Sequence, residues 1–140
     1  MSRLLRLPSL GCALAGSLAL LAASCGDSGP TLYPVNGKVL VNGQPAEGAM
    51  VVLHPADPKA PKPSGTAGPD GSFTLFTHPH GDGSPAGDYA VIVTWYPPDS
   101  RGVENPKSLL PARYADPARS GLKATVQTGP TDLQPFQLTK

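Results

Sequence analysis

The chain has 140 residues and carries 11 Lys or Arg against 10 Asp or Glu, which gives a formal net charge of +1. This balance, without a basic cluster, argues against a nucleic-acid partner. The 18 prolines and 16 glycines fall in the range where disorder has to be considered. They stand between short apolar runs, however, where turns belong, and no long helical period is present. The composition therefore favours a small all-β domain.

The N-terminal segment has the features of an export signal. Arg3 and Arg6 precede an apolar stretch over residues 10–24, and small residues follow it. A membrane-spanning helix would need about 20 apolar residues, and this stretch is shorter and interrupted by Gly11 and Gly16. We therefore expect residues 1–24 to be a signal peptide.

The apolar stretch ends in LALLAASC, residues 18–25. This ending resembles the lipobox of bacterial lipoproteins, in which the cysteine sulfur receives a diacylglycerol and the signal is cut just before that cysteine. The match departs from the family at Ala22, where leucine is commonest, and at Ser24, where glycine or alanine is more usual. The resemblance implies lipidation at Cys25 and attachment to the bacterial cell-envelope membrane through acyl chains. Plain secretory cleavage nearby is the alternative.

Removal of the signal leaves Cys25 as the one cysteine, because Cys12 lies inside the discarded segment. An intramolecular disulfide is then excluded, so the core alone has to hold the fold. Loss of Arg3 and Arg6 changes the net charge to about −1, so acyl chains rather than charge would hold the protein on a membrane. We expect residues 25–32 to form a tether and residues 33–140 to form the folded domain.

Short apolar runs with period-two alternation predict strands in that domain. The clearest run places Tyr89, Val91, Val93 and Trp95 on one face. Pro135 predicts that the last strand lies at a sheet edge. The predicted strands cover residues 35–41, 49–54, 72–77, 89–95, 122–127 and 133–138.

A long segment from Tyr96 to Gly121 shows no strand pattern, apart from a helical turn near residues 109–114 that Pro111 keeps short. Loops of this length are uncommon and often functional. Short strands separated by turn signals, without long helices, predict a small antiparallel β-sandwich of about six to seven strands.

The order of several short motifs resembles the carboxypeptidase regulatory-like domain, a transthyretin-like β-sandwich. The motifs are VNGKV at 35–39, NGQP at 42–45, GAMVVL at 48–53, GPDGSF at 68–73 and GDYAV at 87–91. Two further segments look like those of small bacterial lipoproteins that carry this domain, GDGSPAGDY at 81–89 and LPARYADPARSGL at 110–122. The resemblance implies the fold over residues 33–138 and implies no particular ligand.

Candidate metal ligands gather on one loop, where His78, His80 and Asp82 stand close in sequence. Imidazole suits zinc or copper, and His54 ends a strand that could lie nearby. No thiolate completes the set, and a solvated loop is the simpler interpretation. We expect no bound metal and no cofactor.

Catalytic groups do not stand out. Nucleophilic catalysis needs a nucleophile, a base and an orienting group, and no serine lies in a Gly-x-Ser-x-Gly elbow. We therefore expect a protein that is not an enzyme and has no catalytic residues.

The best candidates for ligand contact are aromatic. Trp95 and Tyr96 stand before two prolines, and Arg113 and Tyr114 belong to the same long segment. Aromatic rings can stack on sugar faces, but alternation favours the interpretation that Trp95 continues the buried face of its strand.

These features predict a non-catalytic, lipid-anchored β-sandwich of the cell envelope that acts as a binding or structural module. Its partner would be an envelope protein or polysaccharide, with no nucleic acid involved. A carbohydrate-binding accessory module is the first alternative, and a metal-handling lipoprotein is the second. Fold alone does not decide among them.

Overall fold

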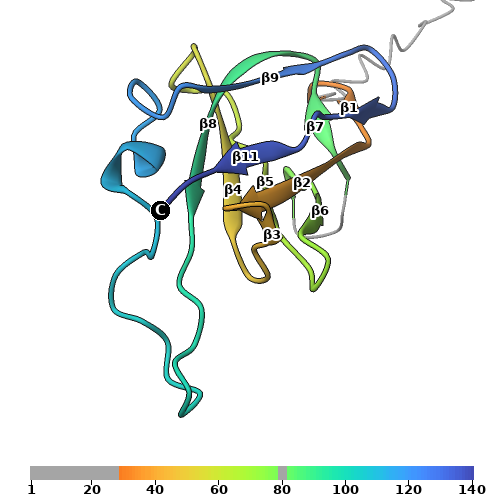
Figure 1. Ribbon diagram of the computed structural model, residues 1–140. Helices are drawn as coiled ribbons and strands as arrows, with labels where there is room; N and C mark the ends of the chain where they lie inside the picture. Colours follow the sequence, from red (N-terminus) through yellow and green to blue (C-terminus); the bar gives the residue numbers. More distant parts are fainter. Residues whose placement is uncertain (1–28, 79–81) are drawn as a thin grey trace, which may run out of the picture.

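The computed structural model describes residues 29–78 and 82–140. Nearly all of the regular structure in these residues is β, which confirms the predicted fold class. A five-stranded and a four-stranded sheet pack face to face, and two further short strands pair with each other. A short 3-10 helix, η1 (Ala112–Ala115), lies within the predicted long loop. No helix within the described residues is long and apolar enough to cross a membrane. Figure 1 shows the arrangement.

The first sheet is built around β2 (Val35–Val41). Antiparallel partners β6 (Ser72–Thr74) and β3 (Gln44–Pro45) lie along one side of β2. Along its other side run two short strands from the end of the chain, β10 (Thr131–Asp132) and β11 (Phe136–Leu138), and both are parallel to β2. The last strand therefore takes the edge position that Pro135 predicts, but its pairing with β2, like that of β10, is parallel, whereas the other strand pairs are antiparallel.

The second sheet has the order β5-β4-β8-β9 and is antiparallel throughout. Its long central strands are β4 (Met50–Pro55) and β8 (Gly87–Thr94), and its outer strands are β5 (Ser64–Thr66) and β9 (Leu122–Val126). The sequence predicts β4, β8 and β9 within two residues at each end. It does not predict β5, because Ser64-Gly65-Thr66 has no apolar alternation and lies between two predicted strands.

The core fills the space between the two sheets. Val51 and Leu53 from β4 and Val91 from β8 are fully buried, as period-two alternation requires of a half-buried strand. The rings of Phe73 and Phe136 lie parallel, with their centroids 6.2 Å apart. Other buried apolar side chains come from both sheets and from the segment around η1: Val35, Val39, Val41, Leu75, Tyr89, Val93, Leu110, Tyr114, Val126 and Leu138.

Gly37 explains how β2 accommodates this aromatic pair. A Cβ at Gly37 would lie 2.4 Å from Cζ of Phe73, which is opposite Gly37 in the strand pairing. The Asn36-Gly37 dipeptide, a common turn signal, is therefore used here inside a strand to make room for a ring.

The two ends of the sandwich differ. At one end β1 (Leu32–Tyr33) pairs with β7 (Ser84–Pro85), next to the start of β8. At the other end β8 finishes, and the chain runs into the predicted loop, which contains an isolated bridge between Pro98 and Glu104 and then η1. Figure 1 shows this loop extending away from the sandwich, opposite β1. We call this the distal end.

Candidate functional site

Trp95 follows β8 directly and is half-buried, with its ring packed against the core. Its indole N–H donates to the carbonyl oxygen of Glu47 at 2.8 Å. Its backbone N–H donates to the Ser108 hydroxyl at 3.0 Å, and its carbonyl accepts from Leu109 at 2.8 Å. The ammonium of Lys140 lies 5.2 Å from the ring centroid, within cation–π range. Trp95 therefore continues the buried face of β8, as alternation predicts, and its backbone ties the start of the long loop to residues 108 and 109.

Tyr96, the next residue, is 45% exposed. It belongs to a set of exposed large apolar side chains, of which four out of five in the described part of the chain lie at the distal end. Those four are Met50, Tyr96, Val103 and Leu109, and we call them the distal apolar group.

Arg113 and Tyr114 form a compact unit on η1. The guanidinium of Arg113 lies 4.7 Å from the Tyr114 ring centroid and donates to the Tyr114 hydroxyl at 2.9 Å and to the Thr139 hydroxyl at 3.3 Å. The Tyr114 hydroxyl also accepts from the backbone N–H of Thr139. Hydrogen bonding with Thr139, and then with Arg113, lowers the pKa of the buried Tyr114 below its ordinary value.

These contacts show which predicted ligand residues the fold brings together. Trp95, Arg113 and Tyr114 all meet the end of the chain, at Thr139 and Lys140. Tyr114 is only 5% exposed, so its contribution is to packing, whereas Tyr96 presents the open aromatic surface.

The loop with the candidate metal ligands uses its carboxylate internally. Asp82 accepts hydrogen bonds from the backbone N–H groups of Thr77 and His78 at 2.8 and 3.1 Å, and its other oxygen lies 2.5 Å from Nδ1 of His78. Although desolvation acts to raise it, these hydrogen bonds lower the pKa of Asp82 to about 2. The Asp82 carboxylate therefore stabilises the local backbone at Thr77 and His78 through hydrogen bonds. His80 lies outside the described residues.

The described side chains form no cluster of candidate metal ligands. Across residues 29–78 and 82–140, no three His, Cys, Asp or Glu side chains gather closely enough to hold an ion. His54, the third histidine, lies on the outer face of the second sheet. Burial, together with repulsion from Lys62, lowers the pKa of His54 below its ordinary value, which favours the neutral imidazole.

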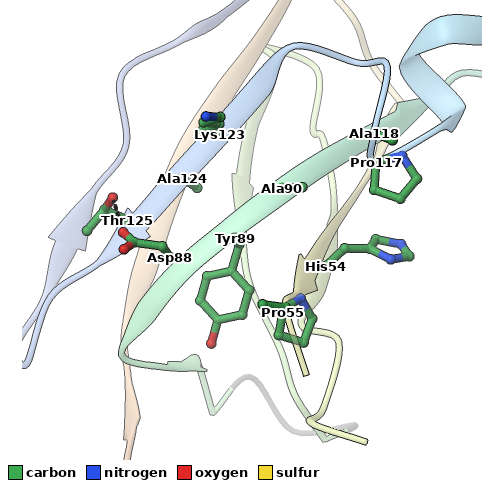
Figure 2. A pocket seen from close by; sticks show the side chains of 11 residues that line it. His54, Pro55, Asp88, Tyr89, Ala90, Pro117, Ala118, Lys123, Ala124 and Thr125 are labelled. Atoms are coloured by element: carbon green, nitrogen blue, oxygen red, sulfur yellow. Dashed lines mark hydrogen bonds between the residues drawn. The ribbon is translucent and has the colours of Figure 1, made fainter. Parts of the chain in front are cut away.

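A groove of about 600 Å³ lies on that outer face. Figure 2 shows His54 and Lys123 on either side of Ala90, whose small side chain forms the floor, with Pro117 bordering the same hollow. The pairing of His54 with Ala90 and of Ala90 with Lys123 places the three residues in one row across the sheet. The groove follows from no motif of the sequence, although Ala90, a small residue among larger ones in β8, is the signal that could have indicated it.

Comparison with known proteins leaves the family of this chain unassigned. No family model matches the sequence, and no curated protein matches it significantly. The structure is similar to a DUF3823 family protein from Parabacteroides merdae, with a TM-score of 0.41 and 17% identity over 79% of this chain and 47% of that one. It is also similar to a 9R-lipoxygenase from Cyanothece, with a TM-score of 0.41 and 16% identity over 79% of this chain and 17% of that one. The chain thus spans about half the length of the first protein and about a sixth of the second, and neither likeness carries a functional argument.

Proposed function

We propose that this protein is a lipid-anchored, non-catalytic β-sandwich of the bacterial cell envelope, of the carboxypeptidase regulatory-like kind, that binds an envelope protein or polysaccharide. The lipobox-like sequence that ends at Cys25 supplies the anchor, and the sandwich supplies the binding surface. Cys25 itself lies outside the described residues.

The position of the first strand supports a short connection to the membrane. β1 begins at Leu32, seven residues after Cys25. A fully extended chain of that length reaches about 25 Å. The sandwich would therefore stay close to the lipid surface, with the β1–β7 end nearest to the membrane.

The observation that carries the binding role is the location of the distal apolar group. Met50, Tyr96, Val103 and Leu109 are between 40% and 57% exposed, and they belong to the start of β4 and to the loop that follows β8. Contiguous exposed apolar surface commonly marks an interaction site. Met50, Tyr96 and Leu109 belong to segments that meet where β8 ends. In an anchored molecule this end would point away from the membrane, where a partner can reach it.

Replacing Cys25 with alanine is expected to remove the protein from the lipidated membrane fraction, because no thiol remains to receive the diacylglycerol. Metabolic labelling with radioactive palmitate and fractionation of cells that produce the full chain would measure this. The matched control is Cys12→Ala, which changes a cysteine inside the signal and is expected to leave labelling intact. A wild-type protein that is already soluble and has a free thiol would contradict the proposal.

A carbohydrate-binding accessory module is the second candidate, because Tyr96 presents an exposed ring beside Trp95. If sugars stack on this ring, Tyr96→Ala is expected to weaken glycan binding at least tenfold, which equals about 1.4 kcal/mol. Binding of the signal-free protein to a glycan array and to purified cell-wall polysaccharide would measure the effect. Phe76→Ala changes an exposed ring at the other end and serves as the control. An absence of glycan binding would leave a protein partner as the ligand.

A further inference from the structure

Two open strand edges face a groove along one flank of the sandwich. β9 is the last strand of the second sheet, and β10 and β11 form the outer side of the first. A groove of about 410 Å³ lies between them, lined by residues 121–125, 127 and 131–137. The turn at residues 127–130 joins the two edges at one end.

The main-chain groups of β9 that point into this groove follow from the hydrogen bonds of its neighbours. Leu53 donates its N–H to the carbonyl of Pro63 at 2.8 Å, so its main-chain groups face β5. Because consecutive residues of a strand alternate in this direction, His54 faces β8. His54 pairs with Ala90, so the main-chain groups of Ala90 face β4 and those of Tyr89, the residue before it, face β9. Because Tyr89 pairs with Ala124, the main-chain groups of Ala124 face β8.

Lys123 and Thr125, the residues on either side of Ala124, consequently point their N–H and C=O groups away from β8. These two residues offer two donors and two acceptors along the free edge of a five-residue strand. Thr125 also donates its hydroxyl to Asp88 at 2.7 Å, which holds its side chain on the outer face of the sheet and leaves its main chain toward the groove.

The opposite wall of the groove, formed by β10 and β11, also points main-chain N–H and C=O groups into the groove. Thr131 and Leu133 donate their N–H groups to carbonyls of Pro34 and Asn36, and Leu138 accepts from Asn42. These residues therefore face β2, and by alternation the main-chain groups of Asp132 and Gln137 face the groove.

The other flank of the sandwich shows how such a gap is closed. There Ser64 and Phe76 exchange two main-chain hydrogen bonds, of 2.9 and 2.8 Å, which join the edge of the second sheet to the continuation of β6. No pairing of this kind joins β9 to β10 or β11 in the described part of the chain. The flank thus lacks the contact that an extended segment would supply.

The side chains around the groove suit a polypeptide. Leu122 and Leu133 are half-buried against the core and form an apolar floor together with Phe136. The walls carry the amides of Gln127, Gln134 and Gln137, which can both donate to and accept from a peptide.

We propose that this groove binds an extended peptide segment of a partner protein, which adds to the edge of β9 as a further strand. Backbone pairing with Lys123 and Thr125 would provide the binding energy, and the apolar floor would favour apolar residues at alternate positions of the peptide. The groove is separate from the distal apolar group, so the inference does not depend on the function proposed for that end.

The test uses a displayed library of linear decapeptides, selected on the signal-free protein and followed by titration of the enriched peptides in synthetic form. Lys123→Pro removes the outward N–H without removing a bond to β8, because proline is tolerated on an edge strand whose N–H faces solvent. Lys123→Ala removes the side chain and keeps the N–H. Unchanged fluorescence of Trp95 and an unchanged thermal midpoint would show that both variants fold.

We expect Lys123→Pro to raise the Kd of the enriched peptides at least tenfold and Lys123→Ala to change it less than threefold. Methylation of alternate peptide nitrogens is expected to weaken binding by a similar factor in one register and to have little effect in the other. The proposal is wrong if no peptide is enriched over albumin-coated wells, if the proline variant binds as the wild type does, or if alanine and proline weaken binding equally. Tight binding of glycans to the groove in place of peptides would also overturn it.

Discussion

Replacing Leu53 with alanine is expected to lower the free energy of unfolding by about 2–5 kcal/mol. Leu53 is fully buried in the middle of β4, between the two sheets. The substitution removes buried apolar surface and leaves a cavity that neighbouring strands fill only in part, because hydrogen bonds to β5 and β8 hold the backbone of β4 in place. Urea titration of the signal-free protein, followed by the fluorescence of its one tryptophan, would measure the loss.

The matched control is Leu109→Ala, which removes the same atoms from a side chain that is 40% exposed. It is expected to change the free energy of unfolding by about 0.5 kcal/mol or less. Equal losses at Leu53 and Leu109 would contradict the packing described above.

Replacing Gly71 with alanine is expected to cost about 2 kcal/mol more than the same change at Gly43. Both glycines have a positive φ, +80° at Gly71 and +79° at Gly43, so both variants bear the strain of about 1–2 kcal/mol that this region imposes on other residues. At Gly71, however, the new Cβ would lie 2.5 Å from the carbonyl oxygen of Val39, whereas nothing lies within 4 Å of it at Gly43.

The clash at Gly71 cannot be relieved by a side-chain rotation, because the atom that it meets belongs to the backbone of β2. The backbone N–H of Val39 also donates to the carbonyl of Gly71 at 2.8 Å, and a shift of either strand would break this bond. An unpaired buried N–H costs about 1–3 kcal/mol. Paired urea titrations of the two alanine variants would measure the difference, and similar unfolding midpoints would show that the approach of Gly71 to β2 has no energetic consequence.

Strands with strong local patterns were predictable from the sequence. The alternation of Tyr89, Val91 and Val93 identifies both the position of β8 and its buried face, because period-two burial depends on the strand's own residues. Asn-Gly and Asp-Gly pairs are local signals of the same kind, because tight turns need a positive φ, and the structure gives Asn42, Gly43 and Gly71 a positive φ.

Strands without a local pattern were not predictable. Ser64-Gly65-Thr66 contains no large apolar residue, and it becomes β5 because β4 offers it a free edge. The parallel pairing of β2 with β10 and β11 joins residues 96 or 97 positions apart, and no local signal encodes such a distant contact.

The candidate site shows the same division. The sequence identified aromatic residues near the long loop as candidates for ligand contact, and alternation favoured the buried face for Trp95 without excluding a contact. Only the structure showed that the Trp95 indole N–H donates to the carbonyl of Glu47 and that the Lys140 ammonium lies over the Trp95 ring. The side chain of Tyr96, in contrast, is exposed to solvent. These contacts arise between segments that are distant in sequence, so the spacing of residues along the chain does not predict them.

By itself, the sequence determined an all-β chain with its strongest strands and turns. It also carries the Cys25 motif on which the proposed location at the cell-envelope membrane rests. These are local properties, set by alternation, by glycine conformation and by short motifs. The tertiary structure decided which edges stay open, which exposed side chains gather at the distal end and which polar groups are already used within the fold. Those properties depend on how distant strands pack, because an edge or a groove exists only between segments that folding brings together.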